Sequence, residues 1–193
     1  IFTNPITQLV VEWPEESTIA ITTKASAKIS GYLYFVNPKT GIWKKVLGPI
    51  IGLSTKVSHD AKRILASATG RNGQVITNIY NVGTTTATDT TLRTLAEKCT
   101  WGRFYKELVY CATPSVPTTA IYPDDWYKGI VTTYDKIWQL NANNGDIRLI
   151  SSLITQSDKS INVFNMNTDP KDDYLLFMNK DDLSLWSLDL STN

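Results

Sequence analysis

The sequence predicts an all-β protein made of four repeated antiparallel sheets. Runs of β-branched and aromatic residues alternate with Asn, Gly, Pro and Asp turns, and no long stretch keeps apolar residues at helical spacing. A polar turn, an apolar strand, a second turn and an aromatic strand ending in Asn or Asp also recur four times. Intervals of ~40–45 residues between such units are typical of β-propeller blades.

The four repeats follow one another along a single structural unit, residues 1–193. Their polar turns follow Trp13, Ser58, Trp101 and Thr168, so only the third interval is long. The additional residues of the third repeat lie in an insertion over 113–134, which is rich in proline and aromatic residues. We predict four-stranded antiparallel repeats over 8–53, 54–95, 96–153 and 154–190.

Each repeat has recognisable strands and a predicted core. The clearest runs are TIAITTK (18–24) and GYLYFVN (31–37) in the first repeat, and QVITNIYN (74–81) after the Asn72-Gly73 turn in the second. The third has ELVYCAT (107–113) and KIWQL (136–140), and the fourth has SINVFNM (160–166), DYLLFMNK (173–180) and LSLWSLDL (183–190). Residues expected to be mostly buried are Trp13, Tyr34, Ile64, Tyr80, Trp101, Trp138, Phe177 and Trp186.

The blades can be arranged in two ways. In a small closed ring, IFTNPI (1–6) completes the fourth repeat, which offers only three strands before the sequence given stops. In an open half-ring, a second copy or further blades complete a larger propeller. The half-ring is favoured because Pro5 cannot donate to a strand ladder.

Residues 56–81, KVSHDAKRILASATGRNGQVITNIYN, resemble the TolB-type, WD-like propeller repeat. The usual form of that repeat is Ser-Pro-Asp-Gly-Lys, a strand, a Gly-containing turn and an aromatic strand. Here His59 replaces the Pro and Ala61 replaces the Gly, and TDPKDDYLLFMNKDDLSLWSLDL (168–190) is the closest second copy. The resemblance implies a scaffold like those of periplasmic or cell-surface binding proteins, or of the non-catalytic gating domains of some peptidases.

Composition argues against several classes of partner. Lys and Arg number 19 against 18 for Asp and Glu, which gives a net charge of +1 and no basic stripe for nucleic acid. No apolar run approaches the ~18 residues of a transmembrane segment. Because the sequence starts at Ile1 without a charged leader, we expect any signal to have been removed or left out.

No catalytic, metal or cofactor site is predicted. Ser58, His59 and Asp60 are successive residues of one turn, so their side chains diverge and cannot form a catalytic triad. His59 is the only histidine, which argues against His-dependent hydrolysis and multi-histidine metal sites. The Asp pairs at 124–125, 172–173 and 181–182 lack calcium-ligand spacing and are interpreted as solvated hairpin ends.

Cys99 and Cys111 are a candidate disulfide. If 98–111 is a hairpin centred on Tyr105, the cysteines face each other at the ~4.5–5.5 Å that a disulfide can span. Two reduced, buried thiols in a cytosolic propeller remain the alternative. A disulfide would place the protein in the periplasm, at the cell surface or outside the cell.

The insertion is the candidate ligand-binding loop. Tyr122, Trp126 and Tyr127 lie beside Asp124 and Asp125, and aromatic side chains on a proline-stiffened loop suit recognition of a protein or glycan. The alternative is that the loop folds back and buries Trp126 against its own blade.

Two functions are therefore open. The first is a non-catalytic binding or scaffold propeller, exported and surface-associated, with a protein or glycan partner. The second is the accessory propeller of a larger enzyme, such as a peptidase, whose catalytic domain lies outside these residues. Neither requires a cofactor.

Overall fold

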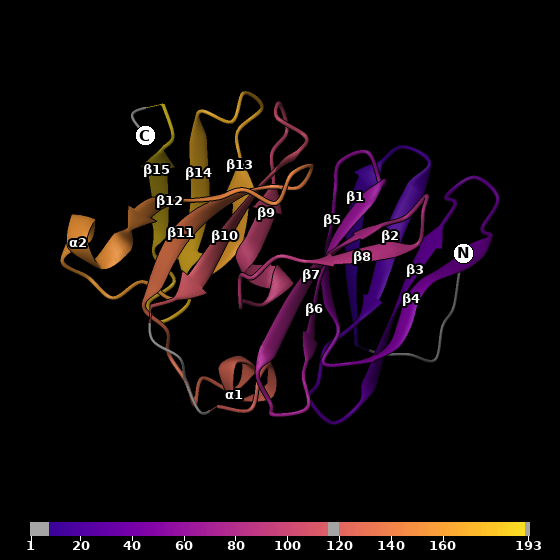
Figure 1. Cartoon of the computed structure of the whole chain (residues 1–193), viewed down its shortest axis with the longest axis horizontal. Coiled ribbons are helices and arrows are strands. Elements are labelled where there is room, and N and C mark those ends of the chain that lie inside the picture. The colour runs from indigo at the N-terminus through magenta and orange to yellow at the C-terminus, as the bar shows by residue number, and fades with distance from the viewer. Residues whose placement is uncertain (1–7, 116–119, 192–193) are drawn as a thin grey trace.

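The computed structural model describes residues 8–115 and 120–191, which form four antiparallel sheets arranged as propeller blades (Figure 1). The first sheet contains β1 (Leu9–Glu15), β2 (Thr18–Thr23), β3 (Ser30–Val36) and β4 (Trp43–Ile51). The second contains β5 (Ser54–Val57), β6 (Arg63–Thr69), β7 (Val75–Asn81) and β8 (Thr86–Asp89). The all-β propeller prediction is confirmed.

The third sheet contains β9 (Cys99–Trp101), β10 (Leu108–Pro114), β11 (Asp135–Asn141) and β12 (Ile147–Ser152). The fourth contains β13 (Val163–Thr168), β14 (Tyr174–Asn179) and β15 (Leu185–Asp189). The described residues also form three short helices: η1 (Ala96–Lys98), α1 (Asp124–Tyr127) and α2 (Leu153–Ser157). Within the described residues the fourth sheet has three strands, which agrees with the three that the sequence of the fourth repeat offers. Residues 1–6, considered for its completion, lie outside that part.

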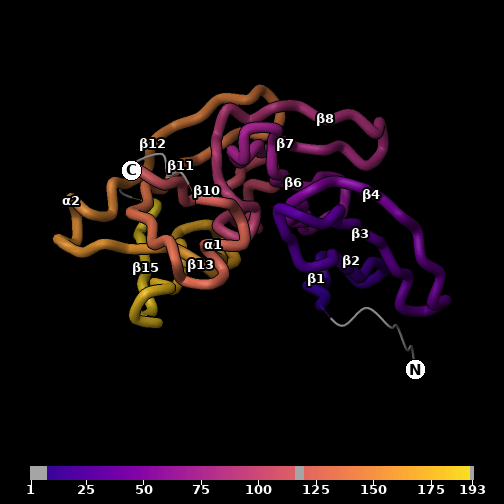
Figure 2. Tube along the Cα trace, turned by 90° about the horizontal axis from the view of Figure 1, so that it is seen from below, coloured from indigo at the N-terminus to yellow at the C-terminus, as the bar shows by residue number. Residues whose placement is uncertain are grey.

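The sheets follow one another round an arc (Figure 2), and a hydrophobic cluster fills each junction between successive sheets. Leu33 and Ile64 meet between the first and second sheets, Leu65 and Val109 between the second and third, and Ile137 and Phe177 between the third and fourth. Among the described residues no such cluster joins the fourth sheet to the first.

The predicted core is confirmed in part. Ile64, Trp101 and Phe177 are buried, while Tyr34, Tyr80, Trp138 and Trp186 are half-buried. The prediction that Trp13 is buried is wrong, because its side chain is 65% exposed. Trp13 lies on the edge strand β1, where it lines a pocket together with residues of the second, third and fourth sheets instead of a packed junction.

Cys99 and Cys111 form a disulfide. They are directly opposed in the antiparallel pairing of β9 with β10, with their Cα atoms 4.1 Å apart. Both are buried in the cluster between the second and third sheets, so the bond fixes the innermost strand of the third blade to its neighbour.

Candidate ligand-binding site

The insertion between β10 and β11 lies at one end of the blades and carries α1 (Figure 1). Two of its aromatic residues are buried: Tyr122 is 8% exposed and Trp126 is 3% exposed. They form a small cluster with Leu95 from the connection between the second and third sheets, and Phe164 of β13 packs against it. The burial of Tyr122 and Trp126 matches the fold-back alternative in part, because the two side chains pack against residues outside their own blade.

Hydrogen bonds connect the insertion to the first and second sheets as well as to its own. Ser26 Oγ and the Ala27 N–H, both in the first sheet's β2–β3 connection, donate to the Asp124 carboxylate at 3.0 and 2.6 Å. Burial raises the pKa of Asp124, but these two hydrogen bonds outweigh that effect and hold the pKa below its usual value. The second sheet contributes Thr69, whose hydroxyl donates to the Tyr122 carbonyl at 2.9 Å.

Trp126 connects the insertion to a buried polar network. Its indole N–H donates to Asn162 Oδ1 at 2.8 Å, at the entry to the fourth sheet. The same oxygen accepts from Lys98 Nζ at 3.1 Å and from the Thr133 hydroxyl at 2.9 Å. The insertion thus contacts all four blades, and we call residues 120–133 the clamp.

Lys98 is the centre of that network. Its ammonium lies 2.7 Å from Asp135 Oδ2 and 2.6 Å from Thr133 Oγ1, and it also faces the ring of Trp126 at 5.3 Å. Burial lowers the pKa of Lys98 below its usual range, although the Asp135 carboxylate opposes this shift. A fully buried ammonium needs such partners, because its desolvation is otherwise costly.

The other candidate residues have separate positions. The half-buried Tyr127 donates its hydroxyl to the Glu97 carboxylate, and Lys24 Nζ lies 4.9 Å from the centre of its ring. Burial and the Glu97 charge raise the pKa of Tyr127, so the phenol keeps its proton. Asp125 instead accepts from the nearby Ile121 N–H at 2.9 Å and makes a local turn.

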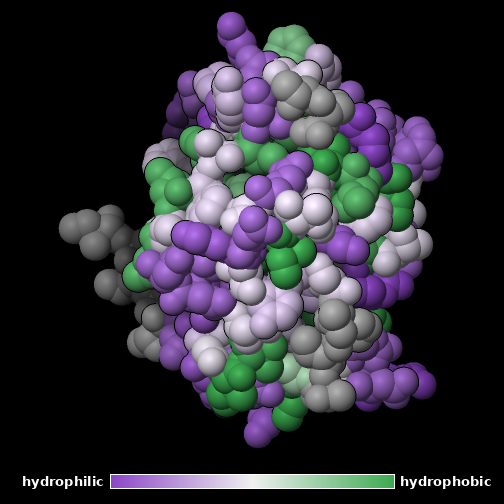
Figure 3. Space-filling view, turned by 90° about the vertical axis from the view of Figure 1, so that its left-hand side faces the viewer, coloured by the Kyte–Doolittle hydropathy of each residue, from purple (hydrophilic) through white to green (hydrophobic). Residues whose placement is uncertain are grey.

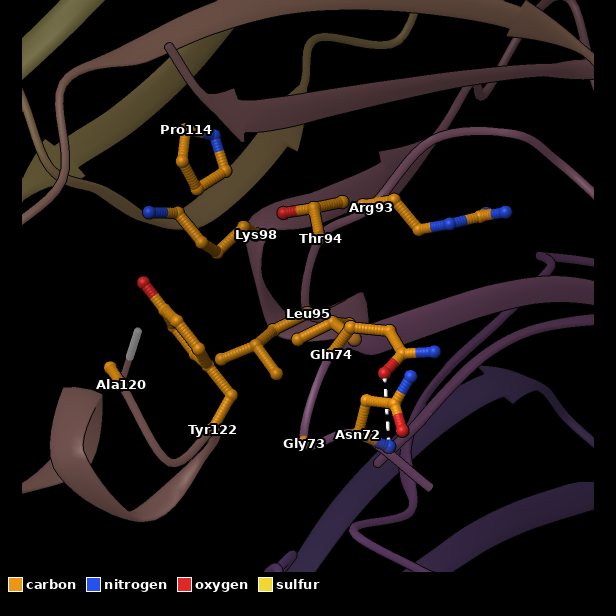
Figure 4. A pocket seen from close by; sticks show the side chains of 11 residues that line it. Asn72, Gly73, Gln74, Arg93, Thr94, Leu95, Lys98, Pro114, Ala120 and Tyr122 are labelled. Carbon is orange, nitrogen blue, oxygen red and sulfur yellow. Dashed lines mark hydrogen bonds between the residues drawn. The ribbon is translucent and has the colours of Figure 1, made fainter. Parts of the chain in front are cut away.

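A cavity of about 340 Å³ opens beside the clamp, between the second and third blades. Its floor is apolar, with Val75, Leu95, Pro114 and Tyr122, whereas amides and a guanidinium stand at its rim: Asn72, Gln74 and Arg93. Figure 4 shows Lys98 and Tyr122 on one side and the rim residues on the other, where the Asn72 N–H donates to Gln74 at 3.1 Å. An apolar floor with few polar groups suits a small ligand or one side chain of a partner.

Sequence reasoning missed Lys98, Asp135 and Asn162. They are far apart along the chain and lie in ordinary polar contexts, so nothing in their spacing indicates that η1, the third sheet and the entry to the fourth sheet bring them together. Within the described residues, no group of three or more His, Cys, Asp and Glu side chains is placed to hold a metal ion. No helix of that part is long and apolar enough to cross a membrane.

The fold resembles that of several solved propellers. TolB from Acinetobacter baumannii superposes with a TM-score of 0.65 at 12% identity, over 98% of this chain and 42% of that protein. A putative TolB from Agrobacterium tumefaciens gives the same TM-score at 10% identity, over 98% and 61% of the two chains. The tricorn protease gives 0.56 at 10% identity, over 91% and 16%.

These similarities show the β-propeller fold of TolB-type proteins, as the repeat resemblance predicts. The chain spans less than two thirds of each of the three structures. No protein-family model and no curated protein matches the sequence.

Proposed function

We propose that this chain is a non-catalytic binding propeller that holds part of a protein or glycan in the cavity beside the clamp. The observation that carries the proposal is the combination of an apolar floor, formed by Leu95 and Tyr122, with the rim residues Gln74 and Arg93. Because the clamp contacts all four blades, the floor is rigid and little order is lost when a ligand enters.

A protein segment is the favoured ligand. One apolar side chain fits the floor, and the backbone beside it meets the amides of Asn72 and Gln74. Arg93 is already paired with Asp89 through contacts of 3.0 and 3.1 Å, so the rim presents a neutral ion pair rather than a free cation. Free carboxylates and phosphates are therefore weaker candidates than neutral peptides.

The test compares two tryptophan substitutions in the same loop. Ala120→Trp fills the cavity, whereas Ile121→Trp adds similar bulk at a neighbouring residue that is 51% exposed and outside the cavity lining. On peptide and glycan arrays, we expect the wild type and Ile121→Trp to retain the same probes and Ala120→Trp to lose them. Equal retention by all three proteins would exclude the cavity as the binding site.

The disulfide supports a location in an oxidising compartment, either the periplasm or the cell exterior. Fractionation of cells that express the native gene tests this location. Recovery of the protein from the cytosol with two free thiols would contradict it.

An accessory propeller of a larger enzyme is the second candidate function. It is favoured by the similarity to the tricorn protease, of which this chain covers 16%. Sequencing the native gene on both sides of the region separates the two candidates, because a catalytic domain in the same reading frame would favour the second.

A further inference from the structure

A second cavity, of about 250 Å³, lies between the second and third blades. The connection 90–95 separates it from the cavity beside the clamp, because this segment crosses β7 at Thr77. There the Thr77 hydroxyl donates to the Thr94 carbonyl at 2.7 Å and accepts from the Thr94 N–H at 3.2 Å. Val75 lines the first cavity and Ile79 lines the second, so the two are distinct sites on either side of Thr77. We call the second one the interblade cavity.

The second and third sheets each contribute a turn to the interblade cavity. In the second sheet, Arg63 is directly opposite Asn81 in the pairing of β6 with β7, and Asn81 is opposite Thr86 of β8. Directly opposed residues of an antiparallel pair share one face of the sheet, so these three side chains stand together. In the third sheet, Asn141 begins the turn between β11 and β12 and lines the same cavity. The strand pairing therefore fixes which polar groups meet there.

Asn81 and Asn141 offer donors to the cavity, because their acceptors are already used. Asn81 Oδ1 accepts the N–H groups of Gly83 and Thr84 at 2.9 and 3.1 Å, and Asn141 Oδ1 accepts the Asn143 N–H at 2.9 Å. A backbone N–H can only donate, so these bonds determine which amide atom is the oxygen. Each Nδ2 group lies on the other side of its amide, away from the turn, and makes no hydrogen bond within the described residues.

Arg63 supplies a positive charge that has no carboxylate partner among the described residues. Its side chain is half-buried, and its guanidinium donates to Asn143 Oδ1 at 2.6 Å, which orients the group. Among the described residues that line the cavity, Arg63 is the only basic one and Asp89 is the only acidic one. Asp89 is already paired with Arg93, so the interblade cavity keeps one uncompensated positive charge.

The cavity also separates apolar from polar groups. Leu140 is buried and Ile79 is half-buried, and together with Ala142 they form an apolar floor below the polar rim. On the open side of the molecule that carries α2 and β15, hydrophobic and hydrophilic residues are intermixed instead (Figure 3). An apolar floor with a few oriented polar groups is typical of a small-molecule site.

We propose that the interblade cavity binds a carboxylate group through Arg63, Asn81 and Asn141. The donors that remain there, one guanidinium and two amide groups, are planar and match a planar carboxylate. One uncompensated positive charge suits a monoanion, whereas a phosphate would place a second negative charge near Asp89. A free small acid and the C-terminal carboxylate of a peptide share this chemistry. The site is additional to the cavity beside the clamp and does not depend on the function proposed for that cavity.

NMR titration of nitrogen-labelled wild type at constant ionic strength tests the proposal, with acetate, N-acetylglycine and the neutral analogue acetamide as probes. The Arg63 Nε–H signal and the side-chain amide signals of Asn81 and Asn141 should shift to saturation with both carboxylates and stay unchanged with acetamide. Tighter binding of N-acetylglycine than of acetate indicates a peptide C-terminus. Binding of acetate that is at least as tight indicates a free small acid.

Two substitutions remove the proposed contacts. Arg63→Met keeps most of the length of the side chain and removes its charge, and Asn141→Asp replaces the Nδ2 donor with a carboxylate oxygen. Each should weaken carboxylate binding at least about tenfold, because a charge-assisted hydrogen bond is lost or a like charge is introduced. Asn141→Asp keeps the oxygen that the turn needs, as in the fourth blade, where Asp189 accepts the Ser191 N–H at 2.8 Å.

Arg71→Met and Asn37→Asp are the matched controls. Arg71 is exposed and outside the cavity lining, and Asn37 Oδ1 accepts the N–H groups of Lys39 and Thr40 at 2.9 and 3.0 Å in the corresponding turn of the first blade. Both variants should bind carboxylates like the wild type. So should Ala120→Trp, which fills only the cavity beside the clamp, and this result distinguishes a failure of the one proposal from a failure of the other.

The proposal is overturned if no carboxylate gives a saturating shift, if acetamide gives the same shifts as acetate, or if inorganic phosphate binds more tightly than both carboxylates. It is also overturned if Arg63→Met and Asn141→Asp fold, as judged by their backbone spectra, and bind like the wild type. If Arg63→Met does not fold, Asn141→Asp and the wild-type titration decide the question.

Discussion

Lys98 and Asp135 form an ion pair of 2.7 Å between side chains that are 1% and 0% exposed. One comes from η1, before the third sheet, and the other from β11 of the same sheet. Asp135 Oδ2 also accepts the Val163 N–H at 2.7 Å, so the pair connects the third sheet to the fourth.

Removal of either charge should be strongly destabilising. Asp135→Asn and Lys98→Met should each lower the free energy of unfolding by about 3–5 kcal/mol, because the remaining charge stays buried without its counterion. The double variant should lose less than the sum of the two. Urea unfolding measures all three, with the exposed Lys106→Met as control. Strictly additive losses would show that the two charges are not coupled.

Trp126 should be the main stabilising residue of the clamp. Trp126→Ala should lower the free energy of unfolding by about 3–5 kcal/mol, because a buried aromatic side chain leaves a cavity. Trp126→Phe keeps most of the packing and loses the hydrogen bond to Asn162, at a cost of about 1 kcal/mol.

Ile130→Ala is the matched control for the clamp, since Ile130 belongs to the same insertion but is 67% exposed. Thermal unfolding of the three variants gives the comparison. Similar melting temperatures for Trp126→Ala and Ile130→Ala would mean that the clamp does not stabilise the blades.

The disulfide should stabilise the folded chain. It closes a loop with a sequence separation of 12, for which a contribution of about 2–3 kcal/mol is expected. Mass spectrometry of unfolded protein before and after reduction should differ by two hydrogens. The double variant Cys99→Ala/Cys111→Ala should melt earlier than the oxidised wild type and be insensitive to reductant, and an unchanged melting temperature would contradict the expected contribution.

Asp172 should anchor the fourth sheet to the third. Its carboxylate accepts the N–H groups of Arg103, Phe104 and Tyr105 at 2.8, 3.1 and 2.9 Å. Asp172→Ala should therefore cost about 2–4 kcal/mol in unfolding free energy. The neighbouring exposed Asp173→Ala should cost less than about 0.5 kcal/mol, and equal effects in urea unfolding would refute this role.

The sequence was sufficient for the architecture because blade repeats are local patterns. Turn chemistry and strand alternation act over a few residues, and the symmetry of Cys99 and Cys111 about a hairpin turn is also local. Each is visible without knowledge of which sheets become neighbours.

Burial at the ends of the arc and in the insertion was not predictable in the same way. Trp13 is a residue type common in cores, but its side chain lies at a pocket that residues of several sheets line, and this arrangement is not visible in the local sequence. The aromatic residues of the clamp indicate a contact surface. The sequence does not show whether that surface contacts a ligand or the protein's own four blades. The interpretation of the Asp pairs as solvated turns was wrong for Asp172. Its carboxylate is buried and accepts backbone N–H groups from a loop about 70 residues away in the chain, which the local sequence does not indicate.

The contact between Asp124 and the first sheet should depend on pH. The unfolded carboxyl has a pKa of ~3.9, and the folded value is lower, so the unfolded chain binds more protons between the two values. The stability contributed by Asp124 is therefore complete above the unfolded pKa and is lost as the pH falls through the folded one. Wild type should exceed Asp124→Asn in unfolding free energy by a constant amount from about pH 5 to 8, and by less below about pH 4.

Urea titrations at several pH values provide the measurement, and Asp158→Asn controls for the change in net charge at an exposed residue. Direct NMR titration of the Asp124 carboxyl carbon should give a midpoint below that of an unfolded peptide, because the hydrogen bonds from Ser26 and Ala27 favour the charged form. A midpoint at or above the peptide value, with no change in the stability difference down to pH 3, would show that these bonds do not hold the clamp to the first blade.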